Sequence, residues 1–126
     1  MADGEQKKLV DIRDRAFEFA VRIVKLCKYL ETNTDVSRNV ISQLLRSGTS
    51  VGANLEEARA GQSTADFIHK NAIALKEARE SNYWLRLVLA TETLRNDIRT
   101  GIEELRDEAV VITKIVAKTI LTAKSK

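Results

Sequence analysis

The chain has 126 residues, no proline and only five glycines, and its formal net charge is +3. This length corresponds to about one domain, and the scarcity of turn-forming residues argues against all-β and loop-rich folds. The 21 basic residues are nearly balanced by 18 acidic ones, which is not the one-sided charge of a dedicated nucleic-acid binder. A hydrophobic content of 44% is enough to form a core.

The cysteine count and the amino-terminal sequence exclude further classes. With Cys27 as the only cysteine, neither an internal disulfide nor a thiolate metal cage can form. Its apolar neighbours predict a buried, inert side chain. Residues 1–10 lack the apolar core of a signal peptide, and no apolar stretch approaches the roughly 20 residues of a membrane span. We therefore expect a cytoplasmic protein without a membrane partner.

The first helical segment covers about residues 8–31. Its main apolar stripe has spacings of three and four residues, which places it on one helix face: Ile12, Ala16, Phe19, Ile23, Leu26 and Leu30. We expect Phe17, Val21 and Val24 to widen this buried face. The polar stretch 32–35 ends the segment and supplies candidate N-caps for the next helix.

The second segment, about residues 36–60, contains two glycines within its apolar pattern. A glycine inside a helix costs about 1 kcal/mol relative to alanine, so two of them indicate close approach of another backbone. We predict that Gly48, Gly52 and Asn54 serve close helix packing. A buried Arg46 would need a carboxylate partner, for which Glu57 and Glu77 are the candidates.

Two further helices are expected at about residues 64–93 and 97–123. Gly61 is placed to end the second helix, and so short a connection makes the second and third helices antiparallel neighbours. The motif Thr100-x-x-Glu103 resembles a capping box, which would start the last helix three residues later. Together the four segments predict one domain over residues 1–126, an all-α, antiparallel up-down four-helix bundle.

The last two helices carry more apolar surface than one narrow seam requires. Trp84 and its neighbour Leu85 point about 100° apart, and Val111 and Ile115 flank the main stripe of the last helix. These flanks either broaden the core or form a subunit interface. We favour an interface that includes Trp84, Val111 and Ile115, and therefore a closed homo-oligomer.

Two blocks of sequence resemble a known family: RSGTSVGANLEEA and DFIHKNAIALKEARESNYWLRL. They are similar to bacterial four-helix-bundle proteins first noted as encoded by intervening sequences in large-subunit ribosomal RNA genes. The resemblance covers nearly the whole chain and implies a homopentamer without established enzymatic activity. A related branch, the accessory protein of diversity-generating retroelements, forms such a pentamer and binds reverse transcriptase and nucleic acid through basic surface.

No catalytic, cofactor or metal site is predicted. His69 is the only histidine, and Asp66-x-x-His69 superficially resembles one element of a di-metal bundle. Such a site needs two of these elements and two more carboxylates. A nucleophilic pair of Cys27 with His69 is disfavoured because the cysteine is expected to be buried.

One ridge of the third helix combines basic residues with an aromatic: His69, Lys76, Arg79, Tyr83 and Arg86. Such a ridge suits phosphate contact with base stacking, whereas nearby Glu77 and Glu80 favour an ordinary solvated face. The leading interpretation is a non-enzymatic, self-assembling scaffold or accessory protein. The alternative is a nucleic-acid-binding accessory factor that contacts RNA or DNA through this ridge, with a reverse transcriptase as a candidate partner.

Overall fold

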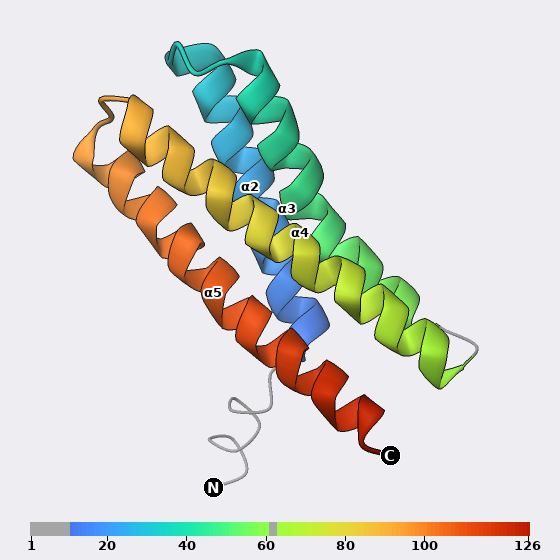
Figure 1. Ribbon diagram of the computed structural model, residues 1–126. Helices are drawn as coiled ribbons and strands as arrows, with labels where there is room; N and C mark the ends of the chain where they lie inside the picture. The colour runs from blue at the N-terminus through green and yellow to red at the C-terminus, as the bar shows by residue number, and fades with distance from the viewer. Residues whose placement is uncertain (1–10, 61–62) are drawn as a thin grey trace, which may run out of the picture.

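The computed structural model describes residues 11–60 and 63–126, and these residues form four helices and no strand. The helices are α2 (Ile12–Asn33), α3 (Arg38–Arg59), α4 (Thr64–Thr91) and α5 (Asn96–Lys124). Each helix runs antiparallel to the next, and α2 also contacts α5 (Figure 1). The expected all-α class is therefore confirmed. The expected start of the first helix at residue 8, and the stop at Gly61, lie outside the described residues.

Short polar side chains cap three of the four helices. The side chains of Asp11, Ser37 and Ser63 each accept a hydrogen bond from a backbone N–H in the first turn of α2, α3 and α4. Each bond satisfies one of the donors that a helix start leaves without a partner. Helix α5 has no side-chain cap and begins at Asn96, so the capping box at Thr100 does not set its start.

A close approach of two helices lies between α2 and α3, at Gly48. Gly48 is buried, and a Cβ atom added to it would lie only 2.7 Å from Cγ2 of Ile23 and 2.8 Å from its Cγ1. One turn further along α3, an added Cβ at Gly52 would lie 3.5 Å from the backbone of Ala16, which is ordinary van der Waals contact. Only the first glycine leaves no room for a side chain.

Ion pairs close the opposite seam, between α2 and α5. Arg15 donates to both carboxylate oxygens of Glu108, at 2.6 and 2.9 Å, and Arg22 pairs with Glu104 at 2.9 Å. Both pairs are partly exposed, so each contributes up to about 1 kcal/mol. These ion pairs add little to the free energy of unfolding, and their main effect is to fix the orientation of α2 relative to α5.

The expectation that Phe17 widens the buried face of the first helix is wrong. Phe17 is 63% exposed, whereas Ala16 beside it is fully buried. Successive residues on a helix point about 100° apart. Ala16 faces α3 near Gly52, and Phe17 is rotated away from the core to the outside of α2.

The buried face of α4 is partly polar. It includes Asn71, Glu77 and Ser81, while Ile68, Leu75 and Leu89 are only half-buried. An apolar stripe locates a helix face, but the packing partner decides which residues lie at its centre. Here α3 contributes the polar partners described below.

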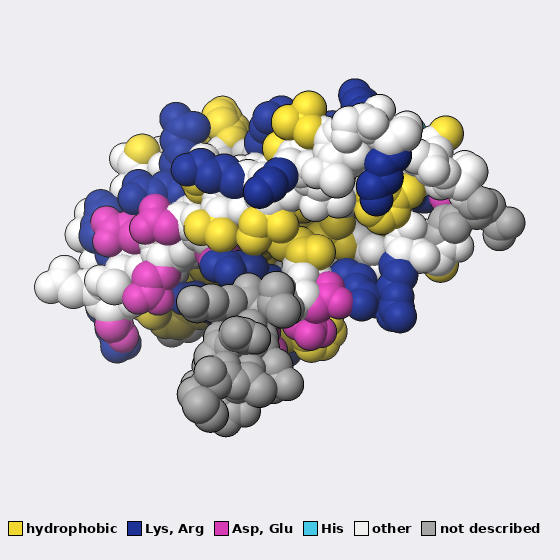
Figure 2. Space-filling view, turned by 90° about the horizontal axis from the view of Figure 1, so that it is seen from below, with side chains coloured by type: hydrophobic (Ala, Val, Ile, Leu, Met, Phe, Trp, Pro, Cys, Tyr) yellow, Lys and Arg dark blue, Asp and Glu magenta, His cyan; other side chains and the backbone are white. Residues whose placement is uncertain are grey.

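The surface mixes apolar and charged side chains. On the face seen in Figure 2, hydrophobic side chains form an interrupted row along the long axis, with Lys and Arg on both sides of it. Within the described ranges, no helix is both long and apolar enough to cross a lipid bilayer.

Candidate interaction surfaces

A pair of buried serines joins α3 to α4. Ser47 and Ser81 are fully buried, and the Ser81 hydroxyl lies 3.0 Å from Oγ of Ser47 and 2.9 Å from the carbonyl oxygen of Glu77. Ser47 in turn donates to the carbonyl of Leu44 at 3.3 Å. Both hydroxyls therefore have partners inside the protein. This contact favours the observed alignment of α3 along α4, because sliding either helix would break the hydrogen bond between the two hydroxyls.

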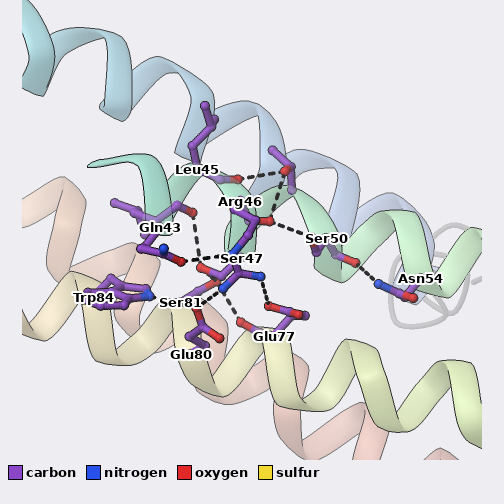
Figure 3. Close-up of polar contacts among 12 residues, drawn as sticks. Gln43, Leu45, Arg46, Ser47, Ser50, Asn54, Glu77, Glu80, Ser81 and Trp84 are labelled. Atoms are coloured by element: carbon purple, nitrogen blue, oxygen red, sulfur yellow. Dashed lines mark hydrogen bonds and ion pairs between the residues drawn. The ribbon is translucent and has the colours of Figure 1, made fainter. Parts of the chain in front are cut away.

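Arg46 extends this contact to the protein surface (Figure 3). Its guanidinium donates to Gln43 Oε1 at 3.1 Å and to Glu77 Oε1 at 3.0 Å, and it also pairs with Glu80. The Glu77 side chain is only 9% exposed, so the arginine supplies the counter-charge that a buried carboxylate requires. Of the two carboxylates considered from the sequence, Glu77 and not Glu57 is the partner.

Trp84 belongs to the same network. Its indole Nε1 donates to Oε2 of Glu80 at 3.0 Å, and its ring packs partly buried against the core, edge-on to Tyr83 with ring centroids 5.1 Å apart. The hydrogen bond from Trp84, together with Arg46, holds the pKa of Glu80 below its ordinary value of 4.5. Trp84, proposed from the sequence as an interface residue, is therefore held within the α3–α4 contact and is only partly accessible.

The five ridge residues of α4 lie together on its outer side. From His69 to Ala90, the exposed positions of this helix contain no acidic residue. They are His69, Ala72, Lys76, Arg79, Tyr83, Arg86 and Ala90. None of the ion pairs in the described part of the chain involves Lys76, Arg79 or Arg86. We call these seven residues the α4 stripe.

The two carboxylates that could neutralise the α4 stripe face elsewhere. Glu77 is buried against α3, and Glu80 binds Arg46 and Trp84. Both carboxylates thus pair with Arg46, which lies on α3 and outside the stripe. The three cations of the stripe, which form no ion pair among the described residues, lie along about 15 Å of helix, at 1.5 Å per residue.

The residues proposed for close packing have different surroundings. Gly48 and Gly52 lie against α2, as described above. Asn54 is half-buried and donates to the carbonyl of Ser50, at 2.8 Å, within its own helix. Its side-chain hydrogen bond therefore stays within α3.

Apolar side chains on α5 remain accessible on two sides of the helix. Val111 and Ile115, the other proposed interface residues, are half-buried, and Ile115 borders an open hollow of about 400 Å³ with Phe67 and Thr119. Leu121 is 68% exposed and Val110 39%. The two most exposed large apolar residues of the described chain, Leu121 and Phe17, were missed as surface residues. Only the packing of the helices distinguishes them from core residues of the same type.

The side chains capable of chemistry are isolated from one another. Cys27 is buried, and burial raises the pKa of its thiol to about 11. His69 is exposed near the start of α4, at the opposite end of the molecule from the end of α2 that carries Cys27 (Figure 1). Over residues 11–60 and 63–126, no cluster of His, Cys, Asp and Glu side chains is positioned to hold a metal ion.

The chain is similar to proteins of one family. Residues 8–118 match the family described as 23S rRNA-intervening sequence protein. A crystal structure at 1.70 Å of a protein from Bacteroides thetaiotaomicron VPI-5482, described as of unknown function and from the S23 ribosomal protein family, is 44% identical in sequence. The similarity covers 87% of this chain and 98% of that one, with a TM-score of 0.78. No functionally curated protein shows significant similarity to the chain.

Proposed function

The chain belongs to the 23S rRNA-intervening sequence protein family, and we propose that it is a non-enzymatic protein that self-assembles and acts as a scaffold or accessory subunit. The observation that carries this proposal is that large apolar side chains are left exposed on three helices of the single chain. Phe17, Leu121 and Tyr83 are each more than half exposed. Phe17 adjoins the half-buried Val21 and Val24 on α2, and adjoining apolar side chains on a surface are typical of protein contacts.

The form of the assembly that we propose is a homopentamer, as the family resemblance implies, and we propose that it lies in the cytoplasm. A closed ring with an odd number of subunits needs a head-to-tail contact, in which two different faces of the chain meet. The half-buried Val111 and Ile115 on α5 would belong to one of these faces. Trp84 would contribute through its accessible edge.

Co-expression of tagged and untagged copies tests self-assembly. If the chain assembles, purification by the tag will recover both copies together. In the control, an unrelated helical protein carries the tag, and the untagged copy should then be absent. Recovery of the tagged copy alone, at protein concentrations well above those of the cell, would contradict the proposal.

A second function, binding of RNA or DNA, is favoured by the α4 stripe. Three cations that form no ion pair among the described residues lie with an exposed tyrosine on one helix face, which suits contact with phosphates and stacking on bases. In this proposal the protein is an accessory factor of a nucleic-acid enzyme, with a reverse transcriptase as the candidate partner. Both functions are compatible, because assembly would repeat the stripe in every subunit.

Salt dependence distinguishes specific use of the α4 stripe from weak general attraction. Three phosphate contacts per chain predict that the logarithm of the binding constant falls with the logarithm of salt concentration with a slope of about −2 to −3. The double change Arg79→Gln and Arg86→Gln should remove most of this slope. The matched control, Lys114→Gln with Lys118→Gln, changes the net charge equally on α5 and should leave most of it. Equal losses in both variants would show that the stripe has no special role.

A further inference from the structure

The outermost ridge of α2 has an unusual order of charges. Asp14, Glu18, Val21, Lys25 and Lys28 follow one another at spacings of four, three, four and three residues, so they form one line along the helix. Both acids come first, both bases come last, and the valine lies between them. The line is about 21 Å long at 1.5 Å per residue. We call these five residues the α2 ridge.

All four charges of the α2 ridge are exposed, and none of them forms an ion pair among the described residues. The other cations of α2 differ in this respect, since Arg13, Arg15 and Arg22 each form an ion pair. A solvated helix face usually alternates signs at spacings of three or four, which lets neighbours attract. The ridge instead places like charges beside each other, so its charge order does not stabilise the single chain.

The helix dipole explains only part of this order. Acids near the start of a helix and bases near its end are favourable, but the effect falls off within the first and last turns. Asp14 lies in the first turn of α2, whereas Glu18 and Lys25 lie well inside the helix. Their separation into an acidic and a basic half needs another reason.

Apolar side chains occupy the middle of the same surface. Val21 is half-buried at the centre of the ridge, and beside it lie the 63% exposed Phe17 and the half-buried Val24. On the neighbouring helix, Leu45 is 39% exposed and extends toward α2 (Figure 3). A partner that covered this surface would bury apolar groups at its centre and meet charges at both ends.

We propose that the α2 ridge binds the α2 ridge of a second copy of this chain, antiparallel, about a two-fold axis at Val21. In that arrangement Asp14 meets Lys28 of the other copy and Glu18 meets Lys25, while Phe17 packs near Val24. Each contact of the ridge then occurs twice, once from each copy, as a two-fold arrangement requires. The order of charges is complementary to itself only in this direction, because a parallel pairing would set acid against acid.

This inference rests on the proposed self-assembly and names one surface that mediates it. A two-fold contact is distinct from the head-to-tail contact of a five-membered ring. If the ring forms, the α2 ridge joins two rings. If it does not, the ridge alone gives a dimer.

Charge reversal with mixing tests the α2 ridge directly. One variant carries Asp14→Lys and Glu18→Lys, and the other carries Lys25→Glu and Lys28→Glu. Each variant alone has a ridge of one sign and should show half the mass of the wild-type assembly by light scattering. An equimolar mixture should recover the wild-type mass, because one all-basic ridge then meets one all-acidic ridge. The control variant, Glu57→Lys with Glu103→Lys, changes the net charge as much as the first variant and should keep the wild-type mass.

The outcomes separate this inference from the proposed function. An assembly whose mass is unchanged in both ridge variants would overturn the role of the ridge and leave self-assembly standing. A wild-type chain that is monomeric at every concentration would overturn both. Halved masses without recovery on mixing would also contradict the two-fold pairing, provided that circular dichroism shows both variants to be helical.

Discussion

Gly48 shows how a single residue fixes the distance between two helices. The sequence indicates close packing at both Gly48 and Gly52, but only the structure identifies the opposing atoms. Ile23 is fully buried and β-branched, so its Cγ atoms cannot move away from a new side chain at Gly48. At Gly52 an added Cβ would find ordinary contact distances. Two glycines four residues apart therefore have different roles.

Alanine substitutions should separate these roles. Gly48→Ala should lower the free energy of unfolding by about 1–3 kcal/mol, because overpacking outweighs the helix propensity that alanine gains. Gly48→Leu should be worse still. Gly52→Ala should be neutral or stabilising by up to about 1 kcal/mol. Gly101→Ala is the control, because nothing lies within 4 Å of its added Cβ. Chemical denaturation measures all four, and an unchanged stability of Gly48→Leu would show that the α2–α3 contact is wrong.

Trp84 is the only tryptophan, so its fluorescence reports on the hydrogen bond with Glu80. The lowered pKa of Glu80 means that the unfolded chain binds this proton more readily than the folded one. Its contribution to stability is therefore present above pH 4.5 and is lost as the pH falls through the lowered pKa. We expect the Trp84 emission to stay constant from neutral pH down to 4.5 and to change only below it.

Glu80→Gln removes the titrating group and should abolish this acid-induced step while retaining an acceptor for the indole. Far-UV circular dichroism at each pH separates the local change from acid unfolding. A step centred at or above pH 4.5 in the wild type would contradict the proposed hydrogen bonding.

At the scale of the helices, the contact between α3 and α4 contains a buried polar layer. The buried serines, Arg46 and Glu77 all have partners on the facing helix. A polar layer inside an apolar seam penalises alternative alignments, because a shift breaks the serine hydrogen bond and separates the buried Glu77 from Arg46. The α2–α3 seam, by contrast, depends on shape alone at Gly48.

A double-mutant cycle on Arg46 and Glu77 measures this contribution. Arg46→Met should lower the free energy of unfolding by about 1–3 kcal/mol, between the values typical of exposed and buried ion pairs, because it leaves Glu77 buried without a counter-charge. Adding Glu77→Leu should recover much of the loss. If the two single effects simply add, the two side chains do not interact in solution.

The sequence could predict the four helices but not which residues lie at their centres. Apolar spacing, polar caps and the absence of proline locate the helices to within a few residues. Glu77 and Ser81 have types that usually lie outside, and Phe17 has a type that usually lies inside. Their positions depend on the neighbouring helices: Arg46 and Ser47 accommodate the first two, and no neighbour covers the third. Periodicity within one helix contains no information about those partners.

Spacing predicts the basic residues of the α4 stripe, but it does not predict that the acidic residues beside them pair with another helix. Glu77 and Glu80 directly follow Lys76 and Arg79 in the sequence, and only the helix packing shows that both pair with Arg46. The α2 ridge was not recognised, although its order of acid and base is visible in the sequence. The structure shows that no other helix covers the charged residues of this ridge, and only then does the order of charges suggest a contact with another copy.

At the scale of the whole molecule, the account rests on association. The chain has exposed apolar residues on α2 and α5, a cationic stripe on α4 and no assembled chemical site among its described residues. These features suit a protein that binds macromolecules, and its own copies first of all. The other proposals, including the two-fold contact and the repeated cationic stripe, are consequences of that association.

The most direct test is the native mass of the wild-type protein, measured by light scattering over a wide range of concentrations. The account predicts an assembly, of about 70 kDa for a ring of five 14.1 kDa chains, or of twice that mass where the α2 ridges join two rings. A mass of 14.1 kDa that does not change with concentration would contradict it, because the exposed apolar residues would then have no partner copy.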